Sequence, residues 1–147
     1  MSYPAIHIAQ LLLTKFKDQS HSQELMTNLK LQKMLYYEQG FHLAAFGTPL
    51  FNESIEAWMY GPVVPTVYEH FSDKGSSGIE PAENEIFDLS EDEATLFNNV
   101  FDVYNQFSAT KLVEMTHSEP PWCNSEVGRG CVISNESMEA FFKTRLS

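Results

Sequence analysis

The chain has 147 residues, of which 43% are hydrophobic and 13% aromatic, and its nine basic and twenty acidic residues give a formal net charge of −11. A chain of this length forms one packed core, and its charge opposes binding to nucleic acid or to anionic membranes. No run approaches the ~18 to 20 apolar residues that span a bilayer, and the start lacks the basic region and cleavage site of a secretory signal, so we expect a cytoplasmic protein.

Two helices are predicted in the first third of the chain. Residues 3–17 carry apolar side chains at helical spacing, and Pro4 lies in a first turn, where proline is tolerated. After a polar stretch, Thr27 or a neighbour can cap a second helix that continues through Phe46 and ends at Gly47. The residues expected to face the core are Ala5, Ile8, Ala9, Leu12, Leu13 and Phe16 in the first helix, and Leu31, Met34, Leu35, Phe41, Ala44 and Ala45 in the second.

The middle of the chain changes character twice. Around residues 54–60, apolar and polar side chains alternate, which predicts a short extended or β segment that ends at Gly61-Pro62. Pro65 then begins a short helix through Phe71. Residues 73–89 are rich in glycine, serine, proline and acidic residues, and we expect a mobile acidic loop there.

Further helices are predicted after this loop. Ser90 and Glu93 have the spacing of a capping box. The stripe that follows consists of Phe97, Val100, Phe101, Tyr104 and Phe107. Ser108 can cap another short helix that Pro120-Pro121 stops, and Ser134 or Asn135 can start a last helix whose inner side carries Met138, Phe141, Phe142 and Leu146.

These elements predict a mainly α fold, in which residues 1–147 form a compact single-domain bundle of five to six helices with the short extended segment around residues 54–60. The charge is uneven, because residues 75–147 hold four basic and thirteen acidic residues, a net charge of −9. Seven acids lie between Glu80 and Glu93 without a base among them. This run is either a solvated face or a docking surface for a basic partner.

Motifs for catalysis or metal binding are mostly missing from the sequence. It has no glycine-rich phosphate loop, nucleophile elbow, HExxH or CxxC. His117, Glu119, Cys123 and Cys131 are spaced too widely for a structural zinc site, so we expect no metal and no cofactor. Two enzyme alternatives remain. One uses Cys123 with His42 or His117, and the other is a histidine and carboxylate site built from Glu56, His117 and Glu119.

Three aromatic residues lie in or beside glycine and proline turns, namely Trp58, Tyr60 and Trp122. They are either core residues that hold the connections between helices or exposed anchors for a partner. We expect Trp58 and Trp122 to be mostly buried, with the turn at residues 61–65 packed against the helix at residues 29–44.

Three segments, in this order, resemble the signature of the Panacea domain, a family of SocA-like antitoxins and phage-associated proteins. They are NLKLQKMLYY at 28–37, PLFNESIEAWMYGPVVPTVY at 49–68 and THSEPPW at 116–122. Together they span most of the chain. Met34 departs from the pattern, where leucine is commoner, but a core tolerates a swap of similar volume.

The resemblance implies a helical antitoxin, not an enzyme, that neutralises a cognate toxin by direct binding. It also allows an adaptor that delivers a toxin to an ATP-dependent protease, or a phage-encoded inhibitor of a host defence protein. The implied partners are therefore a toxin and, for an adaptor, protease machinery. From the charge and the lack of a long apolar run we expect no membrane partner and no nucleic-acid partner, and the sequence does not determine the oligomeric state. The signature residues expected to bind the partner or to support its site are Lys33, Tyr36, Tyr37, Glu56, Trp58, Tyr60, His117, Glu119 and Trp122.

Overall fold

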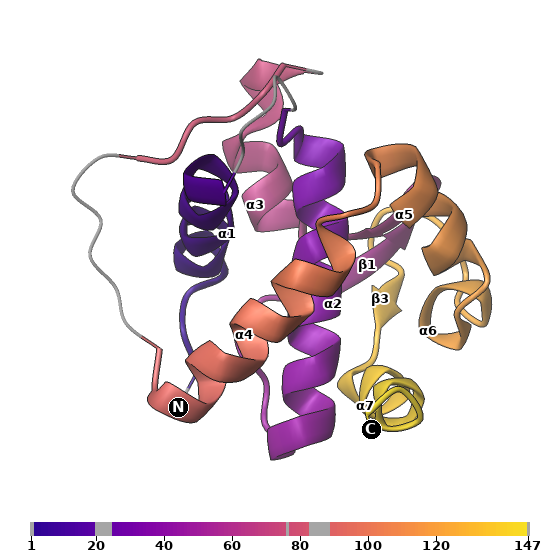
Figure 1. Ribbon diagram of the computed structural model, residues 1–147. Coiled ribbons are helices and arrows are strands. Elements are labelled where there is room, and N and C mark those ends of the chain that lie inside the picture. The colour runs from indigo at the N-terminus through magenta and orange to yellow at the C-terminus, as the bar shows by residue number, and fades with distance from the viewer. Residues whose placement is uncertain (1, 20–24, 76, 83–88, 147) are drawn as a thin grey trace.

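A computed structural model describes residues 2–19, 25–75, 77–82 and 89–146. In these ranges helices dominate and a small sheet lies to one side (Figure 1). The helices are α1 (Ala5–Gln19), α2 (Asn28–Phe46), α3 (Pro65–His70), the 3-10 helix η1 (Ser72–Lys74), α4 (Glu91–Tyr104), α5 (Ala109–His117), α6 (Pro120–Cys123) and α7 (Asn135–Lys143), and the strands are β1 (Ile55–Trp58), β2 (Gly61–Val63) and β3 (Val132–Ile133).

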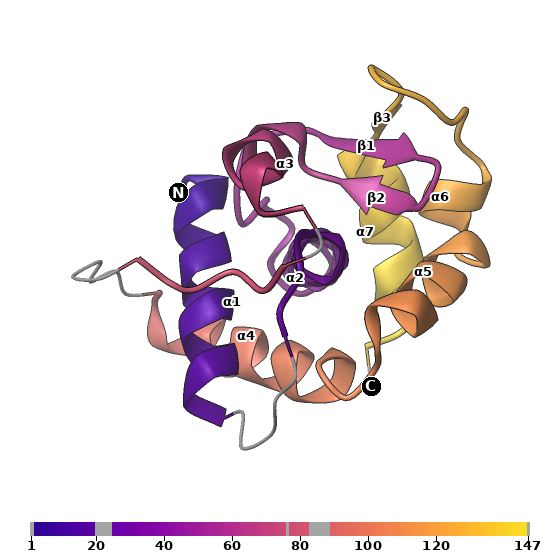
Figure 2. The same ribbon diagram turned by 90° about the horizontal axis from the view of Figure 1, so that it is seen from above.

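Helix α2 is the centre of the fold. Figure 2 looks along it and shows α1, α3, the sheet, α7, α5 and α4 arranged around it. Asn28 and every residue from 30 to 44 are buried, as expected for a helix that is covered on all sides. Gln39 is one buried polar side chain of α2 that has partners, because it accepts hydrogen bonds from the backbone of Leu50 and Phe51 and donates one to the Phe51 carbonyl.

The three strands form an antiparallel sheet in the order β2-β1-β3. Strand β1 confirms the extended segment expected around residues 54–60, and it pairs with β2 so that Trp58 lies opposite Gly61. Strand β3 adds to the other edge of β1 through Ile133, which lies opposite Ile55. The sequence did not predict β3, because two residues are too few to show an alternating pattern.

The expected helix caps are confirmed. The Thr27 side chain accepts a hydrogen bond from the Lys30 amide at the start of α2, and Gly47 ends that helix in the left-handed conformation with φ 73°. Ser90 and Glu93 form the capping box of α4. The Ser108 and Ser134 side chains cap α5 and α7 by accepting hydrogen bonds from the Lys111 and Ser137 amides. Local chemistry therefore determines where these helices begin.

Several expected boundaries and faces differ in the structure. All six core residues predicted in α1 are buried, but Ala45 in α2 is exposed. Leu146 is 39% exposed, because α7 ends at Lys143 and its inner face stops there. Pro120 and Pro121 follow the end of α5 but also begin α6, since proline suits a first helical turn.

The acidic segment is partly held against the body. The Ile79 amide donates to the Met26 carbonyl at 2.9 Å, and the Ala82 amide donates to the Gln10 side chain at 2.7 Å. Residue 76 and residues 83–88 of the expected mobile loop lie outside the described residues. No helix in the described part of the chain is long and apolar enough to cross a membrane.

Candidate functional site

Two consecutive tyrosines of α2 hold one buried carboxylate. The Tyr36 hydroxyl donates to Glu119 Oε1 and the Tyr37 hydroxyl to Glu119 Oε2, both at 2.9 Å. Burial raises the pKa of Glu119 to about 7, although the hydrogen bonds from Tyr37 and Tyr36 and the charge of Arg145 act to lower it. Burial and the nearby Glu119 raise the pKa of both tyrosines, so they remain donors. The cluster joins α2 to the connection between α5 and α6.

Lys33 lies one turn before these tyrosines and is fully buried. Its amine donates a hydrogen bond to the Pro62 carbonyl at 3.1 Å. Burial is the cause that lowers the pKa of Lys33 to about 7. Gly61, with φ 108°, lies over the Lys33 stem, and a Cβ atom there would come within 2.8 Å of both Lys33 Cε and Thr116 Oγ1. Glycine at position 61 therefore allows the hairpin to approach α2 closely.

The two tryptophans join the sheet to the α5–α6 segment, which comprises residues 109–123. The Trp122 indole N–H donates to the Trp58 carbonyl at 2.8 Å. The His117 ring stacks on Trp122 with ring centroids 3.9 Å apart. Both tryptophans are only half-buried, so the expectation that they are mostly buried is met in part. The expected packing of the 61–65 turn against α2 is confirmed by hydrogen bonds from Lys33 to the Pro62 carbonyl and from the Val64 amide to Gln32.

Glu56 and neighbouring side chains hold the Trp58 side chain. One oxygen of Glu56 accepts hydrogen bonds from the Trp58 indole and from the Gly130 amide, each at 2.8 Å. The Arg129 guanidinium lies over the Trp58 ring, 4.6 Å from its centroid. The Tyr68 ring makes a T-shaped contact with the same tryptophan, with centroids 5.2 Å apart. These contacts fix the orientation of the Trp58 ring.

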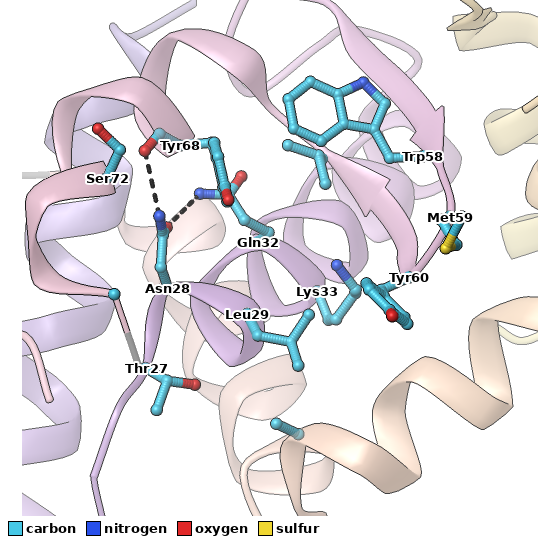
Figure 3. Close-up of a pocket in the computed structure, with 13 residues that line it drawn as sticks. Thr27, Asn28, Leu29, Gln32, Lys33, Trp58, Met59, Tyr60, Tyr68 and Ser72 are labelled. Carbon is cyan, nitrogen blue, oxygen red and sulfur yellow. Dashed lines mark hydrogen bonds between the residues drawn. The ribbon is translucent and has the colours of Figure 1, made fainter. Parts of the chain in front are cut away.

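A groove of about 480 Å³ opens beside this hairpin, between α2, β1, β2, α3, η1 and the start of α5 (Figure 3). Among the described residues, its lining includes no aspartate or glutamate, and Lys33 is the one lysine. Leu29 is 38% exposed, Met59 68% and Tyr60 62%, so large apolar side chains at this groove face solvent. The apolar and aromatic lining residues are Leu29, Trp58, Met59, Tyr60, Val63, Tyr68 and Ala109.

The nine residues expected from the sequence fall into three groups. Lys33, Trp58 and Tyr60 line the groove. Tyr36, Tyr37 and Glu119 form the buried cluster, and Glu56, His117 and Trp122 support the hairpin from outside the groove. A second hollow of about 550 Å³ between α6, β3 and α7 contains none of the nine.

The residues of the enzyme hypothesis have other partners. Glu119 is held by two tyrosines, Glu56 by Trp58 and Gly130, and His117 stacks on Trp122. Within the described ranges, no hydrogen bond joins any two of Glu56, His117 and Glu119. Nor do these ranges contain a group of three or more histidine, cysteine, aspartate or glutamate side chains placed to hold a metal ion. Both cysteines are free thiols.

Sequence reasoning missed two apolar residues of the groove. Leu29 was placed in the second helix but was assigned neither to the core nor to a site, and it is 38% exposed at the first turn of α2. Met59 shares the alternation of the buried Ile55 and Ala57. Strand β1 ends at Trp58, so Met59 lies in the hairpin turn and leaves that buried face. The glycine and proline that follow it were the available signal of a turn.

Comparison with known proteins gives a family match. The family described as antitoxin SocA-like, Panacea domain matches residues 31–123. Antitoxin SocA of Caulobacter vibrioides (strain NA1000 / CB15N) is 43% identical over 75 residues, which cover 50% of this chain and 38% of that protein. The match therefore spans well under two thirds of the length of SocA. No solved structure matches the chain.

Proposed function

This chain belongs to the antitoxin SocA-like Panacea domain family, and from that premise we propose that it neutralises a cognate toxin by binding it directly at the groove beside the β1–β2 hairpin. Leu29, Trp58, Met59 and Tyr60 make the contacts. The main support for this proposal is that Leu29, Met59 and Tyr60 are exposed together at one groove. Exposed apolar groups that cluster at a hollow are typical of interaction sites, and aromatic residues are frequent energetic centres of interfaces.

The remaining signature residues act as the frame of this site. Glu119 ties Tyr36 and Tyr37 to the α5–α6 segment, and Trp122 ties that segment to the strand that carries Trp58. A binding surface held in one conformation loses less entropy when the partner arrives. The buried residues therefore position the groove, and the exposed ones contact the toxin.

The acidic half of the chain has a separate part in the proposal. Glu91 and Asp92 are exposed in the first turn of α4. We propose that these and neighbouring acids face basic surface on the toxin and speed the encounter, because opposite charges steer association. The groove, which has no acid among its described lining residues, then supplies the apolar contacts that slow dissociation.

The test expresses the protein encoded by the neighbouring reading frame, with and without this chain, and measures growth of the cells. The chain should restore growth, and the double substitution Met59→Ser and Tyr60→Ser should abolish the protection. A matched control replaces Val103 and Val127, each 49% exposed and outside the groove, with serine. Equal loss in both variants, or full protection by the groove variant, contradicts the proposed site.

The same experiment separates occlusion from delivery to a protease. Immunoblots of the toxin should show an unchanged toxin level when the chain protects the cells, since binding alone neutralises it. Purified toxin and chain should also form a stable complex in size-exclusion chromatography. A toxin that disappears from protected cells would instead identify an adaptor.

A further inference from the structure

We propose that the segment of the partner that enters the groove carries a carboxylate beside its apolar side chains, and that this carboxylate pairs with the amine of Lys33. The inference rests on the proposed function, because the same groove is the binding site. It adds the chemistry of the partner's segment, an apolar stretch with an aspartate, a glutamate or a C-terminal carboxylate.

Lys33 is buried without a charged partner among the described residues. An ammonium group has three N–H donors, and the hydrogen bond to the Pro62 carbonyl satisfies one of them. Lys33 belongs to none of the ion pairs found in the described part of the chain. A buried charge without a counter-charge is costly, and its cost falls when a carboxylate joins it.

The charge at the groove differs from that of the rest of the chain. The chain as a whole has a net charge of −11, yet the described residues that line the groove include one lysine and no aspartate or glutamate. A carboxylate of the partner is therefore not repelled by the described residues that line the groove. The partner's segment is therefore expected to differ from the basic surface proposed to meet the acidic face of α4.

The exposed apolar side chains at the groove favour a protein segment over a small molecule as the occupant. Met59 and Tyr60 remain 68% and 62% exposed, and Leu29 38% exposed, at the rim of the groove. A small ligand within about 480 Å³ leaves much of this apolar rim in water. A folded segment covers both the hollow and the rim, which adds buried apolar area to the complex.

Access to the amine is controlled by the hairpin turn. Lys33 is fully buried in the free chain, and its side chain lies beside Tyr60 at the groove (Figure 3). Tyr60 is largely exposed, so its side chain is free to rotate toward solvent when the partner arrives. The neighbouring Pro62 carbonyl accepts a hydrogen bond from the Lys33 amine, which ties the hairpin backbone to α2.

The chemistry can be tested with two small probes, phenylbutyrate and its uncharged amide phenylbutanamide, titrated into the full chain. The two tryptophan indole N–H signals in an NMR spectrum serve as reporters, since Trp58 lines the groove and Trp122 does not. The Trp58 signal should shift more than that of Trp122. Phenylbutyrate should bind about tenfold more tightly than the amide, as expected for a charge-assisted hydrogen bond.

The variant Lys33→Met provides the decisive comparison, because it keeps an unbranched apolar side chain at that position. It should bind both probes with equal affinity, and its thermal unfolding should be checked to establish that it folds. A second measurement needs no variant. At pH just above the pKa of about 7, pairing favours the charged amine, so calorimetry in two buffers should detect proton uptake when phenylbutyrate binds the parent chain.

The purified toxin should displace phenylbutyrate from the groove. Equal affinity of the parent chain for both probes, absence of binding, or a carboxylate preference that survives in Lys33→Met overturns the inference. Simultaneous binding of toxin and phenylbutyrate also overturns it, because the partner then does not occupy the groove. Failure of the proposed function is a separate result, seen as absence of protection by the unmodified chain.

Discussion

The indole N–H of Trp122 donates a hydrogen bond to the backbone carbonyl of Trp58 at 2.8 Å, across 64 positions of the chain. This bond connects the α5–α6 segment to strand β1, which leads into the exposed hairpin turn at Met59 and Tyr60. The stability of this connection therefore affects the shape of the groove.

Replacing Trp122 with phenylalanine removes this donor but keeps an aromatic ring for stacking with His117. The loss should cost about 1 to 3 kcal/mol of unfolding free energy, because the Trp58 carbonyl loses its partner. Urea denaturation followed by circular dichroism measures the change. Val127→Ala, at an exposed position, should change stability by less than about 0.5 kcal/mol, and an equally small effect for Trp122→Phe would contradict the assigned role.

The buried groups Glu119 and Lys33 should change the free energy of unfolding with pH in opposite directions. Glu119 should make it fall as the pH rises toward 7, and Lys33 should make it rise above pH 7. The folded-state pKa of Glu119 is raised from 4.5 to about 7, so its contribution is complete below pH 4.5 and is lost as the pH rises toward 7. The folded-state pKa of Lys33 is lowered from 10.5 to about 7. Between pH 7 and 10.5, Lys33 binds a proton more tightly in the unfolded chain than in the folded chain, so the free energy of unfolding should rise with pH over this range.

Two variants separate these contributions. Glu119→Gln should flatten the fall in stability between pH 4.5 and 7, and Lys33→Met should flatten the rise above pH 7. Each slope should amount to roughly a few kcal/mol over its range. Denaturation midpoints measured across the pH range provide the check, and slopes unchanged in both variants would contradict the assignment.

Glu93 should contribute more to stability than its neighbour Glu91. Its carboxylate accepts hydrogen bonds from Tyr3 at 2.7 Å and His42 at 2.6 Å and also completes the capping box with Ser90. Burial acts to raise the pKa of Glu93, but the hydrogen bonds from Tyr3, His42 and Ser90 lower it to about 2. Its contribution is therefore present above pH 4.5 and is lost as the pH falls toward 2.

Glu93→Ala should cost about 2 to 4 kcal/mol at neutral pH, from the lost cap and the lost bonds to its partners. Glu91→Ala, in the same helical turn but exposed, should cost less than about 1 kcal/mol through the helix dipole. Thermal unfolding of the two variants compares them directly. Similar losses would show that Glu93 acts only through its charge near the helix start.

The structure also sharpens the test of electrostatic steering. Neutralising Glu93 would disturb the fold, whereas Glu91→Gln and Asp92→Asn change exposed charges. This double variant should associate with the toxin more slowly at low salt and depend less on salt than the parent, with similar stability. Association rates at two salt concentrations measure this, and identical rates would leave the acidic run as a solvated face.

Gly61 should tolerate alanine much less well than Gly47. Both have positive φ, 108° and 73°, but a Cβ at Gly61 meets Lys33 and Thr116, while nothing lies within 4 Å of one at Gly47. Gly47→Ala should cost about 1 to 2 kcal/mol from backbone strain, and Gly61→Ala about 2 kcal/mol more because the hairpin must move. Chemical denaturation distinguishes these outcomes. Equal costs would mean that the close approach to Lys33 does not limit position 61.

Local sequence determined most of the helices of this protein. Thr27, Ser90, Ser108 and Ser134 each cap a helix in the structure as their spacing predicted, because a cap involves residues only three positions apart. The stripes of apolar residues identified the inner face of α1 for the same reason. The family resemblance was likewise contained in three ordered segments, and the match over residues 31–123 confirms it.

The tertiary structure decided which of these segments contact one another. Tyr36 and Tyr37 meet Glu119 across 83 and 82 positions, and Ile133 joins the sheet opposite Ile55. Such pairings depend on how the helices pack, which no local pattern reports. For the same reason, the sequence could identify Lys33 as a signature residue, but only the packing of the hairpin over α2 shows that its amine is buried with one acceptor at an apolar groove.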